Sequence, residues 1–302
     1  MRLLLTGYTK QNTQDRYDVA VRKFLGWCAD FGHGERFSVE DLDALVFRYI
    51  SWVYVERNTR GNRQNCVNLV SGVSMYLPHA RGRLVLCSRA LHSWDKLVPG
   101  KVGVPVPYGV MLLLCFLFRA AGDREMALLV QLCFRLYLRI SEALGLRVSD
   151  VKVPSKGGGS SSVGGVYMAH AKTGRDQSAV FVDPVLVSFL EEHLVGLGTS
   201  DRLFPFSYSD VRQRLKSALA LLGLSHLPLV TPHSFRHGGA THAYILGTRM
   251  EDIMVQGRWA SLQTARRYVQ AGRSLLFSLR LTSEIEQMVS VLEMDPSLLL
   301  EV

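Results

Sequence analysis

The sequence predicts a mainly helical protein with one small antiparallel sheet, an α+β fold made of a helical first domain and a larger second domain. Apolar residues recur at helical spacing along most of the chain, and short β-branched runs replace that spacing only between residues 147 and 183. Prolines and glycines in VPGKVGVPVPYG, residues 98–109, forbid a continuing helix. We therefore expect one domain over residues 1–99 and a second over residues 100–302.

The first domain is expected to be all helical. Asn12 or Thr13 is able to cap its first helix, and Ser38, followed by acidic residues, caps the second. The third helix ends before Pro78, because proline cannot continue it. The four helices are expected over residues 12–30, 38–57, 63–77 and 84–97.

The second domain is expected to hold the sheet. Two helices come first, and then the runs RVSDVKV, GVYMAHA and SAVFVD alternate with PSKGGGSSSVGG and KTGRDQ, which predicts a three-stranded antiparallel meander. The Gly/Ser stretch at residues 157–165 has the composition of a flexible loop. Helices are expected over residues 108–121, 123–144, 184–196, 208–222, 232–247, 249–256, 261–270 and 274–295.

The composition favours an intracellular protein with a polyanionic partner. Lys and Arg exceed Asp and Glu by 9 in 302 residues, which suits nucleic acid or an anionic membrane surface. The five cysteines include no C-x-x-C pair, so we expect reduced, buried thiols. The longest apolar run, residues 110–118, is shorter than the ~20 residues of a membrane span, and the N-terminus lacks the features of a signal peptide. We expect neither membrane insertion nor export.

The stretch HSFRHGGATH, residues 233–242, gathers three histidines and one arginine. His233 and His237 stand four apart, but no glutamate lies between them and no third ligand follows, so a metal site is not expected. Packing against neighbouring helices is the favoured interpretation of His237 and His242. His233 and Arg236 instead share the first turn of a helix that starts at Thr231 and Pro232, where an anion is stabilised. This pair predicts a phosphate cradle.

Other polar residues become informative in combination with that pair. Arg139 is followed three residues later by Glu142, which is able to orient it, and Lys172 falls in the tight turn between the second and third strands. Downstream, Trp259 precedes Tyr268 by nine residues, and Arg266 and Arg267 stand directly before the tyrosine. Each feature is weak alone, whereas their order and spacing together are specific.

Together these residues resemble the active-site pattern of the tyrosine recombinases, the phage-integrase family that includes Cre and the Xer recombinases. The family's Arg-x-x-Glu/Asp resembles Arg139 to Glu142, and its His-x-x-Arg resembles His233 to Arg236. Its hairpin lysine, its His-or-Trp position and its nucleophile fall on Lys172, Trp259 and Tyr268. Two departures are the tryptophan, where most prokaryotic members carry histidine, and the long Gly/Ser loop. The helical first domain also resembles the family's core-binding domain, so the likeness covers nearly the whole chain.

The resemblance implies cleavage and rejoining of DNA through a 3′-phosphotyrosine formed by Tyr268. Arg139 and Arg236 would clamp the phosphate, and His233 would serve as acid, base and phosphate donor. Lys172 would protonate the leaving 5′-oxygen. Glu142 would support the arginines, and Trp259 would add a hydrogen bond. No metal and no other cofactor is expected, because the arginines supply the positive charge.

The resemblance also implies that the two domains close around double-stranded DNA. The C-terminal helix would pack on its own domain or dock on a neighbouring subunit of a homotetramer, and the protein would act where the DNA is, in the nucleus of a eukaryote or the cytoplasm of a prokaryote. For the basic residues, contact with backbone phosphates and ordinary solvated surface both stay open. The candidate DNA-binding residues are Arg57, Arg60, Arg63, Arg81, Arg83, Arg266 and Arg267.

Three other functions fit part of the pattern. A catalytically inactive descendant that still binds DNA would form no covalent adduct. A type IB topoisomerase would relax arbitrary supercoiled DNA as a monomer. A helix-turn-helix regulator would account for residues 242–259 as helix, glycine turn and helix, but it would leave Arg139 and Lys172 without a role. An integrase or recombinase from a mobile element accounts for all of these residues.

Overall fold

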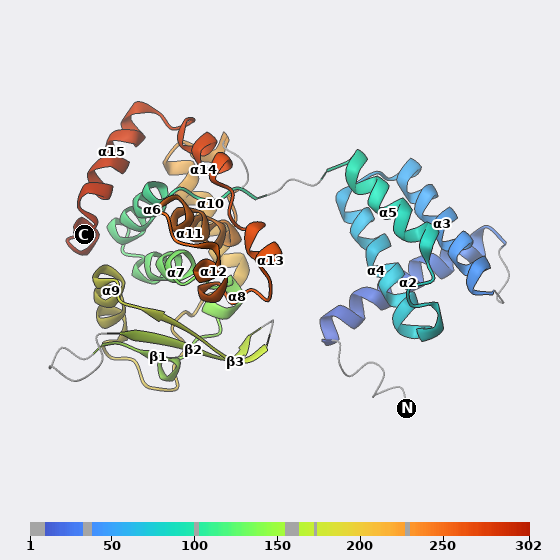
Figure 1. Cartoon of the computed structure of the whole chain (residues 1–302), viewed down its shortest axis with the longest axis horizontal. Coiled ribbons are helices and arrows are strands. Elements are labelled where there is room, and N and C mark those ends of the chain that lie inside the picture. The colour runs from blue at the N-terminus through green and yellow to red at the C-terminus, as the bar shows by residue number, and fades with distance from the viewer. Residues whose placement is uncertain (1–9, 33–37, 100–102, 155–162, 172–173, 227–229) are drawn as a thin grey trace. The chain divides into compact units, whose positions relative to one another are not determined.

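The computed structural model describes residues 10–32, 38–99, 103–154, 163–171, 174–226 and 230–302. The chain divides into two compact units, residues 1–101 and 102–302, and each is described by itself. Helices make up most of both, and the described strands form one three-stranded antiparallel sheet in the second unit (Figure 1). The predicted fold class is confirmed.

The first unit consists of helices only. Ser38 caps the second helix as expected, since its Oγ accepts from the Asp41 N–H at 3.1 Å. Asn12 and Thr13 do not cap the first helix; the carbonyl of Lys10 accepts from the Thr13 N–H, so the helix starts earlier and both residues lie inside its first turn. The elements are α2 (Gln11–Asp30), α3 (Val39–Glu56), α4 (Arg60–Tyr76), η1 (Pro78–Ala80) and α5 (Val85–Leu97).

The core of the first unit also contains a buried carboxylate. Asp43 of α3 accepts from the backbone N–H groups of Leu86 and Cys87 at 2.9 and 3.1 Å, and so satisfies donors in the first turn of α5.

The five cysteines are all buried free thiols, as the sequence predicted. Burial raises the pKa of Cys66, for example, to about 12.

The second unit has its core around two central helices, α6 and α7 (Figure 1). Residues 110–115 of α6 are almost completely buried, so the longest apolar run of the sequence is a core helix. The elements are α6 (Tyr108–Ala120), α7 (Arg124–Arg135), α8 (Ile140–Ala143), η2 (Val148–Asp150), β1 (Val151–Lys152), β2 (Gly164–Ala171), β3 (Gly174–Phe181), α9 (Pro184–Leu194), α10 (Tyr208–Leu221), η3 (Leu224–His226), α11 (Pro232–Ile245), α12 (Met250–Gln256), α13 (Leu262–Arg266), α14 (Ala271–Ser278), α15 (Ser283–Met294) and η4 (Pro296–Leu300).

The sheet has the order β1-β2-β3 and the expected meander topology. Strands β2 and β3 pair from Gly164↔Phe181 to Ala171↔Gly174, so β3 starts earlier than its β-branched residues predicted. Strand β1 is shorter than predicted because Asp150 accepts from the Arg147 N–H at 2.8 Å and folds residues 148–150 into a 3₁₀ turn. Residues 157–162 of the predicted Gly/Ser loop, and Lys172, lie outside the described residues.

Three predicted helices have different bounds. The helix expected over residues 123–144 is broken between α7 and α8, where Tyr137 has a φ of 48° that an α-helix does not allow. The helix expected over residues 274–295 is two, because Thr282 starts α15 by accepting from the Ile285 N–H. The helix expected over residues 261–270 ends at Arg266. In the described part of the chain, no helix has the length and apolar character needed to cross a membrane.

Two glycines allow α11 to cross α7 at short range. A Cβ atom on Gly239 would lie 1.8 Å from the carbonyl oxygen of Phe134, and one on Gly238 would lie 2.3 Å from that of Val106. Neither glycine has a positive φ, so the requirement is space and not backbone conformation. The glycines of HSFRHGGATH therefore set the depth at which α11 enters the core.

We expect Gly239→Ala to lower the free energy of unfolding by ~1–3 kcal/mol or more, since overpacking usually costs this much. The new methyl group meets backbone, which cannot turn away as a side chain would. Chemical denaturation monitored by circular dichroism measures the change. Gly272→Ala is the matched control, since Gly272 lies in α14 with nothing within 4 Å of its added Cβ; an equal loss in both variants would contradict the prediction.

Candidate active site

The structure gathers most of the predicted site residues at one place in the second unit. Arg139 precedes α8, His233 and Arg236 lie in the first turn and a half of α11, and Trp259 follows α12. Tyr268 lies just beyond α13, where its N–H donates to the carbonyl of Ala265 at 2.9 Å. Lys172 lies outside the described residues.

Arg236 is the most deeply buried of these residues, with 0% of its surface exposed. Its Nη1 donates to the carbonyl of Tyr137, and its Nη2 donates to the carbonyl of Gly257 at 2.7 Å. Its guanidinium carbon lies 4.8 Å from the ring centroid of Trp259 and 5.2 Å from that of Tyr268. Two backbone carbonyls and two aromatic faces therefore fix the guanidinium in place.

Glu142 is the carboxylate at the centre of the site. Its Oε1 accepts from Arg139 Nη1 at 2.5 Å, and its Oε2 accepts from the Arg139 N–H at 2.9 Å and from Arg258 Nη2 at 3.1 Å. Arg236 Nη1 stands 3.9 Å from the same Oε2. One buried carboxylate thus accepts hydrogen bonds from two guanidinium groups and lies near a third, which leaves a net positive charge in the cluster.

The aromatic side of the site is built around Tyr268. Its ring centroid lies 4.4 Å from that of His237, 4.5 Å from that of Trp259 and 5.5 Å from that of His233. The Tyr268 carbonyl accepts from Thr241 Oγ1 at 3.2 Å, which ties the tyrosine to α11. His237 and Thr241 of α11 thereby position the segment that follows α13.

Three buried donors in the cluster have no acceptor among the described residues. They are Nε of Arg236, Nε of Arg258 and Nε1 of Trp259. A buried N–H without an acceptor costs free energy, so such groups are uncommon in folded proteins. An anion that reached these donors would satisfy them, whereas an apolar ligand would not.

The charged groups keep their charges at neutral pH. Burial lowers the pKa of Arg236 to about 10, helped by the like charge of Arg139, and this value still leaves it a cation. Burial acts to raise the pKa of Glu142, but hydrogen bonds from Arg139 and the charges of Arg139 and Arg258 outweigh it and hold that pKa below its ordinary value. The cluster is therefore preorganised for a negatively charged ligand.

Arg258 belongs to this cluster, although the sequence analysis gave it no role. It adopts a φ of 55°, in the region that favours glycine, and its side chain is 7% exposed. An arginine between a glycine and a tryptophan resembles ordinary surface charge, and nothing in the sequence indicates the backbone turn that directs it inward.

The predicted DNA-binding arginines differ in their exposure and in their partners within the chain. Arg63 donates to Asp95 at 3.2 Å, and Arg83 donates to Glu40 at 2.5 Å, so both also have partners within the chain. Exposed side chains are found at Arg57, Arg60, Arg81, Arg83, Arg266 and Arg267. Of these, Arg266 and Arg267 stand next to the tyrosine.

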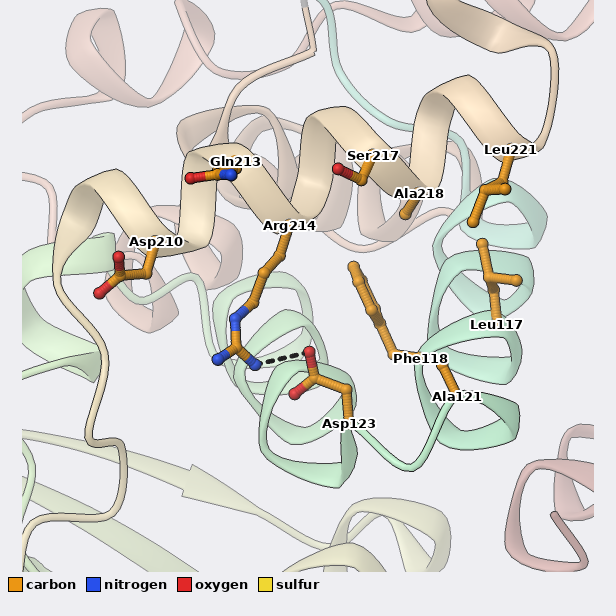
Figure 2. A pocket seen from close by; sticks show the side chains of 10 residues that line it. All are labelled: Leu117, Phe118, Ala121, Asp123, Asp210, Gln213, Arg214, Ser217, Ala218 and Leu221. Atoms are coloured by element: carbon orange, nitrogen blue, oxygen red, sulfur yellow. Dashed lines mark hydrogen bonds and ion pairs between the residues drawn. The ribbon is translucent and has the colours of Figure 1, made fainter.

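Metal ligands and the pocket of Figure 2 are two other features on which a functional site could rest. Over the described ranges, no group of three or more His, Cys, Asp or Glu residues is placed to hold a metal ion. The pocket in Figure 2 lies between α6 and α10, where Arg214 donates to Asp123 at 2.7 Å. Asp123 also accepts from the Met126 N–H and caps α7, so this ion pair joins the start of α7 to the middle of α10.

The family model of the phage integrase family matches residues 113–274, which include every predicted catalytic residue. Among solved structures, the chain is similar to the Tn1549 transposon integrase in complex with transposon right-end DNA, at 14% identity and a TM-score of 0.60 over 92% of this chain and 96% of that one. It is also similar to a lambda integrase dimer bound to a COC′ core site, at 16% identity and a TM-score of 0.56 over 87% and 73%. No curated protein matches the sequence.

Acidification is expected to destabilise the protein through His242. Its ring stacks on Tyr108 at 4.4 Å, and burial, together with the charge of Arg135, lowers its pKa. Below a pH of about 6.5 the unfolded chain takes up this proton first, so the free energy of unfolding declines as the pH falls further. His237, whose pKa burial also lowers, contributes in the same direction.

We expect His242→Gln to flatten this decline between pH 8 and pH 5, as measured by urea denaturation. Each variant is referred to its own stability at pH 8, where the histidine is neutral in both states, so lost packing does not enter the comparison. Parallel curves for wild type and His242→Gln would show that this histidine is not the cause.

Proposed function

Since the chain belongs to the phage integrase family, we propose that it is a site-specific DNA recombinase that cleaves and rejoins double-stranded DNA through a 3′-phosphotyrosine intermediate. One observation carries the proposal. The Tyr268 ring lies against Arg236 and Trp259, and each of these two residues holds a buried donor with no acceptor among the described residues. A nucleophile beside unoccupied anion donors suits attack on a phosphodiester.

The proposed reaction exchanges one ester for another. The oxygen of Tyr268 attacks the scissile phosphorus, the bond from phosphorus to the 5′-oxygen breaks, and the leaving oxygen takes up a proton as the tyrosine loses one. Arg139 and Arg236 neutralise the non-bridging oxygens with a fork geometry that lysine does not reproduce. Attack by the freed 5′-hydroxyl on the phosphotyrosine reverses these steps, so the bond energy is retained for rejoining.

The proposal assigns the remaining roles as follows. His233 exchanges a proton and donates to the phosphate, and Trp259 donates through Nε1. Lys172 protonates the leaving 5′-oxygen. Glu142 holds the arginines, and no metal ion is needed where guanidinium groups supply the positive charge.

Access of DNA to the arginine requires the tyrosine to move. Arg236 has no exposed surface, and the Tyr268 ring lies over it. The phosphate therefore reaches Arg236 once that ring turns aside, and the same movement brings the phenol to the phosphorus. Binding of DNA and placement of the nucleophile become one event.

We further propose that both units contact the DNA and that four copies assemble on it. Exposed arginines of the first unit and Arg266 and Arg267 of the second would bind backbone phosphates. Helix α15 packs on α6 of its own unit, where Gly109 leaves room for Val289 and Glu293. Assembly would then use outward-facing apolar residues of α14 and α15, namely Leu275, Leu276, Leu279, Val291 and Met294.

We expect Tyr268→Phe to abolish covalent capture of DNA. Wild-type protein is incubated with a nicked form of its selected binding site in excess chelator, and adducts are counted on a denaturing gel. Tyr244→Phe, at a half-exposed tyrosine of α11, is the control that should trap DNA as wild type does. Binding without any adduct would favour an inactive descendant, and relaxation of arbitrary plasmid by a monomer would favour a topoisomerase.

Trp259→Phe is expected to slow cleavage about 100- to 1000-fold, because it removes one preorganised donor. The phenyl ring keeps the packing on Tyr268 and Arg236, so thermal stability should change little. Single-turnover rates at saturating DNA measure the effect, and Trp52→Phe in the first unit controls for loss of an indole elsewhere. Cleavage by Trp259→Phe at the wild-type rate would remove the indole N–H from the mechanism.

A further inference from the structure

Arg258 occupies a position that the proposed chemistry leaves unexplained. It is one of two non-glycine residues with a positive φ among those the structure describes, and the other is Tyr137. The two are in contact, since Arg258 Nη2 donates to the Tyr137 carbonyl at 3.3 Å. Backbone strain of this kind persists where surrounding contacts hold it, and it is concentrated at functional sites.

Apart from a bond from Nη1 to the Gln256 carbonyl at 3.4 Å, the side-chain hydrogen bonds of Arg258 go to the segment that carries Arg139. Besides Tyr137, its Nη1 donates to the Leu136 carbonyl at 3.4 Å, and its Nη2 reaches Glu142 Oε2 at 3.1 Å. The Tyr137 carbonyl also accepts from Arg236. One guanidinium therefore bridges the break between α7 and α8, the central carboxylate and the carbonyl that orients Arg236.

The charge of Arg258 matters as much as its shape. Glu142 attracts whichever guanidinium groups surround it, and Arg236 stands at 3.9 Å from Oε2, beyond hydrogen-bond distance. With Arg258 bound to that oxygen, the carboxylate has a cationic partner other than the arginines that would bind the phosphate. Without Arg258, the Arg236 guanidinium would move toward Glu142, and the carboxylate would neutralise the positive charge that a phosphate needs.

We propose that Arg258 is a positioning residue of the phosphate site, which satisfies Glu142 and fixes the segment of residues 136–139 so that Arg139 and Arg236 stay directed at the scissile phosphate. The proposal rests on the proposed function for its substrate, but the arrangement itself predicts anion binding with or without cleavage. Arg258 acts through other residues, because both of its Nη atoms are engaged by Glu142 and backbone carbonyls.

The test compares Arg258→Gln with Arg249→Gln. Arg249 is an arginine just before α12 whose side chain is 77% exposed, so its replacement removes the same charge from the surface. Single-turnover cleavage at saturating nicked DNA and the Kd for that DNA are measured separately. We expect Arg258→Gln to cleave about 10- to 100-fold more slowly, the range typical of groups that orient a ligand-binding residue, with Kd changed less than about twofold.

A second readout does not depend on activity. Inorganic phosphate, added to each protein without DNA, should raise the melting temperature of the wild type and of Arg249→Gln, and raise that of Arg258→Gln less. Arg258→Lys, which keeps the charge but presents a single donor group, should recover part of both losses. If Arg258→Gln does not fold, Arg258→Lys is compared with wild type and should lie below it in both measurements.

The outcomes separate this inference from the proposed function. A wild type that forms no adduct but shows the phosphate difference would overturn the recombinase and support the positioning role. A wild type that cleaves, with Arg258→Gln equal to it in rate and phosphate response, would overturn only the positioning role. Loss of DNA affinity in Arg258→Gln with an unchanged rate would make Arg258 a DNA contact and would also overturn it.

Discussion

The arrangement of the second unit depends on the buried carboxylate of Glu142. A carboxylate and guanidinium groups are costly to bury. They are tolerated here because Glu142 pairs with Arg139 and Arg258, and because Arg236 donates to two backbone carbonyls. Arg139 and Glu142 belong to one short segment, whereas Arg236 and Arg258 arrive from α11 and from the end of α12. The ion pairs therefore join three parts of the chain, and folding of the core and formation of the site are one process.

Close packing places these charges where they are. Helix α11 reaches Glu142 because Gly238 and Gly239 have no side chains that would keep its backbone away from α7. Gly257 leaves room for the ring of Trp259, since a Cβ on Gly257 would lie 2.0 Å from that ring. Glycines at close approaches thus determine how deep the arginines lie. Depth in turn determines how strongly their charges interact with other charges.

The aromatic cluster gives the site a closed resting state. Tyr268 packs among Trp259, His233 and His237 and covers Arg236. Under the proposed function, these rings would partly cover the nucleophile until DNA binds, and the Trp259 ring would offer a donor to the incoming phosphate. Protection and reactivity then rest on one set of contacts.

The sequence alone determined the fold class, because helical periodicity and β-branched runs are local, and it selected the site residues that share helices, such as His233 with Arg236. It erred where distant groups decide local structure. Residues 136–139 leave the helix because their carbonyls are needed by Arg236 and Arg258, and Tyr268 lies beyond α13 because its carbonyl is held by Thr241 of α11. Arg258 itself was found only in the tertiary structure, since its backbone turn and its partners come from contacts across more than a hundred residues, which no local pattern records.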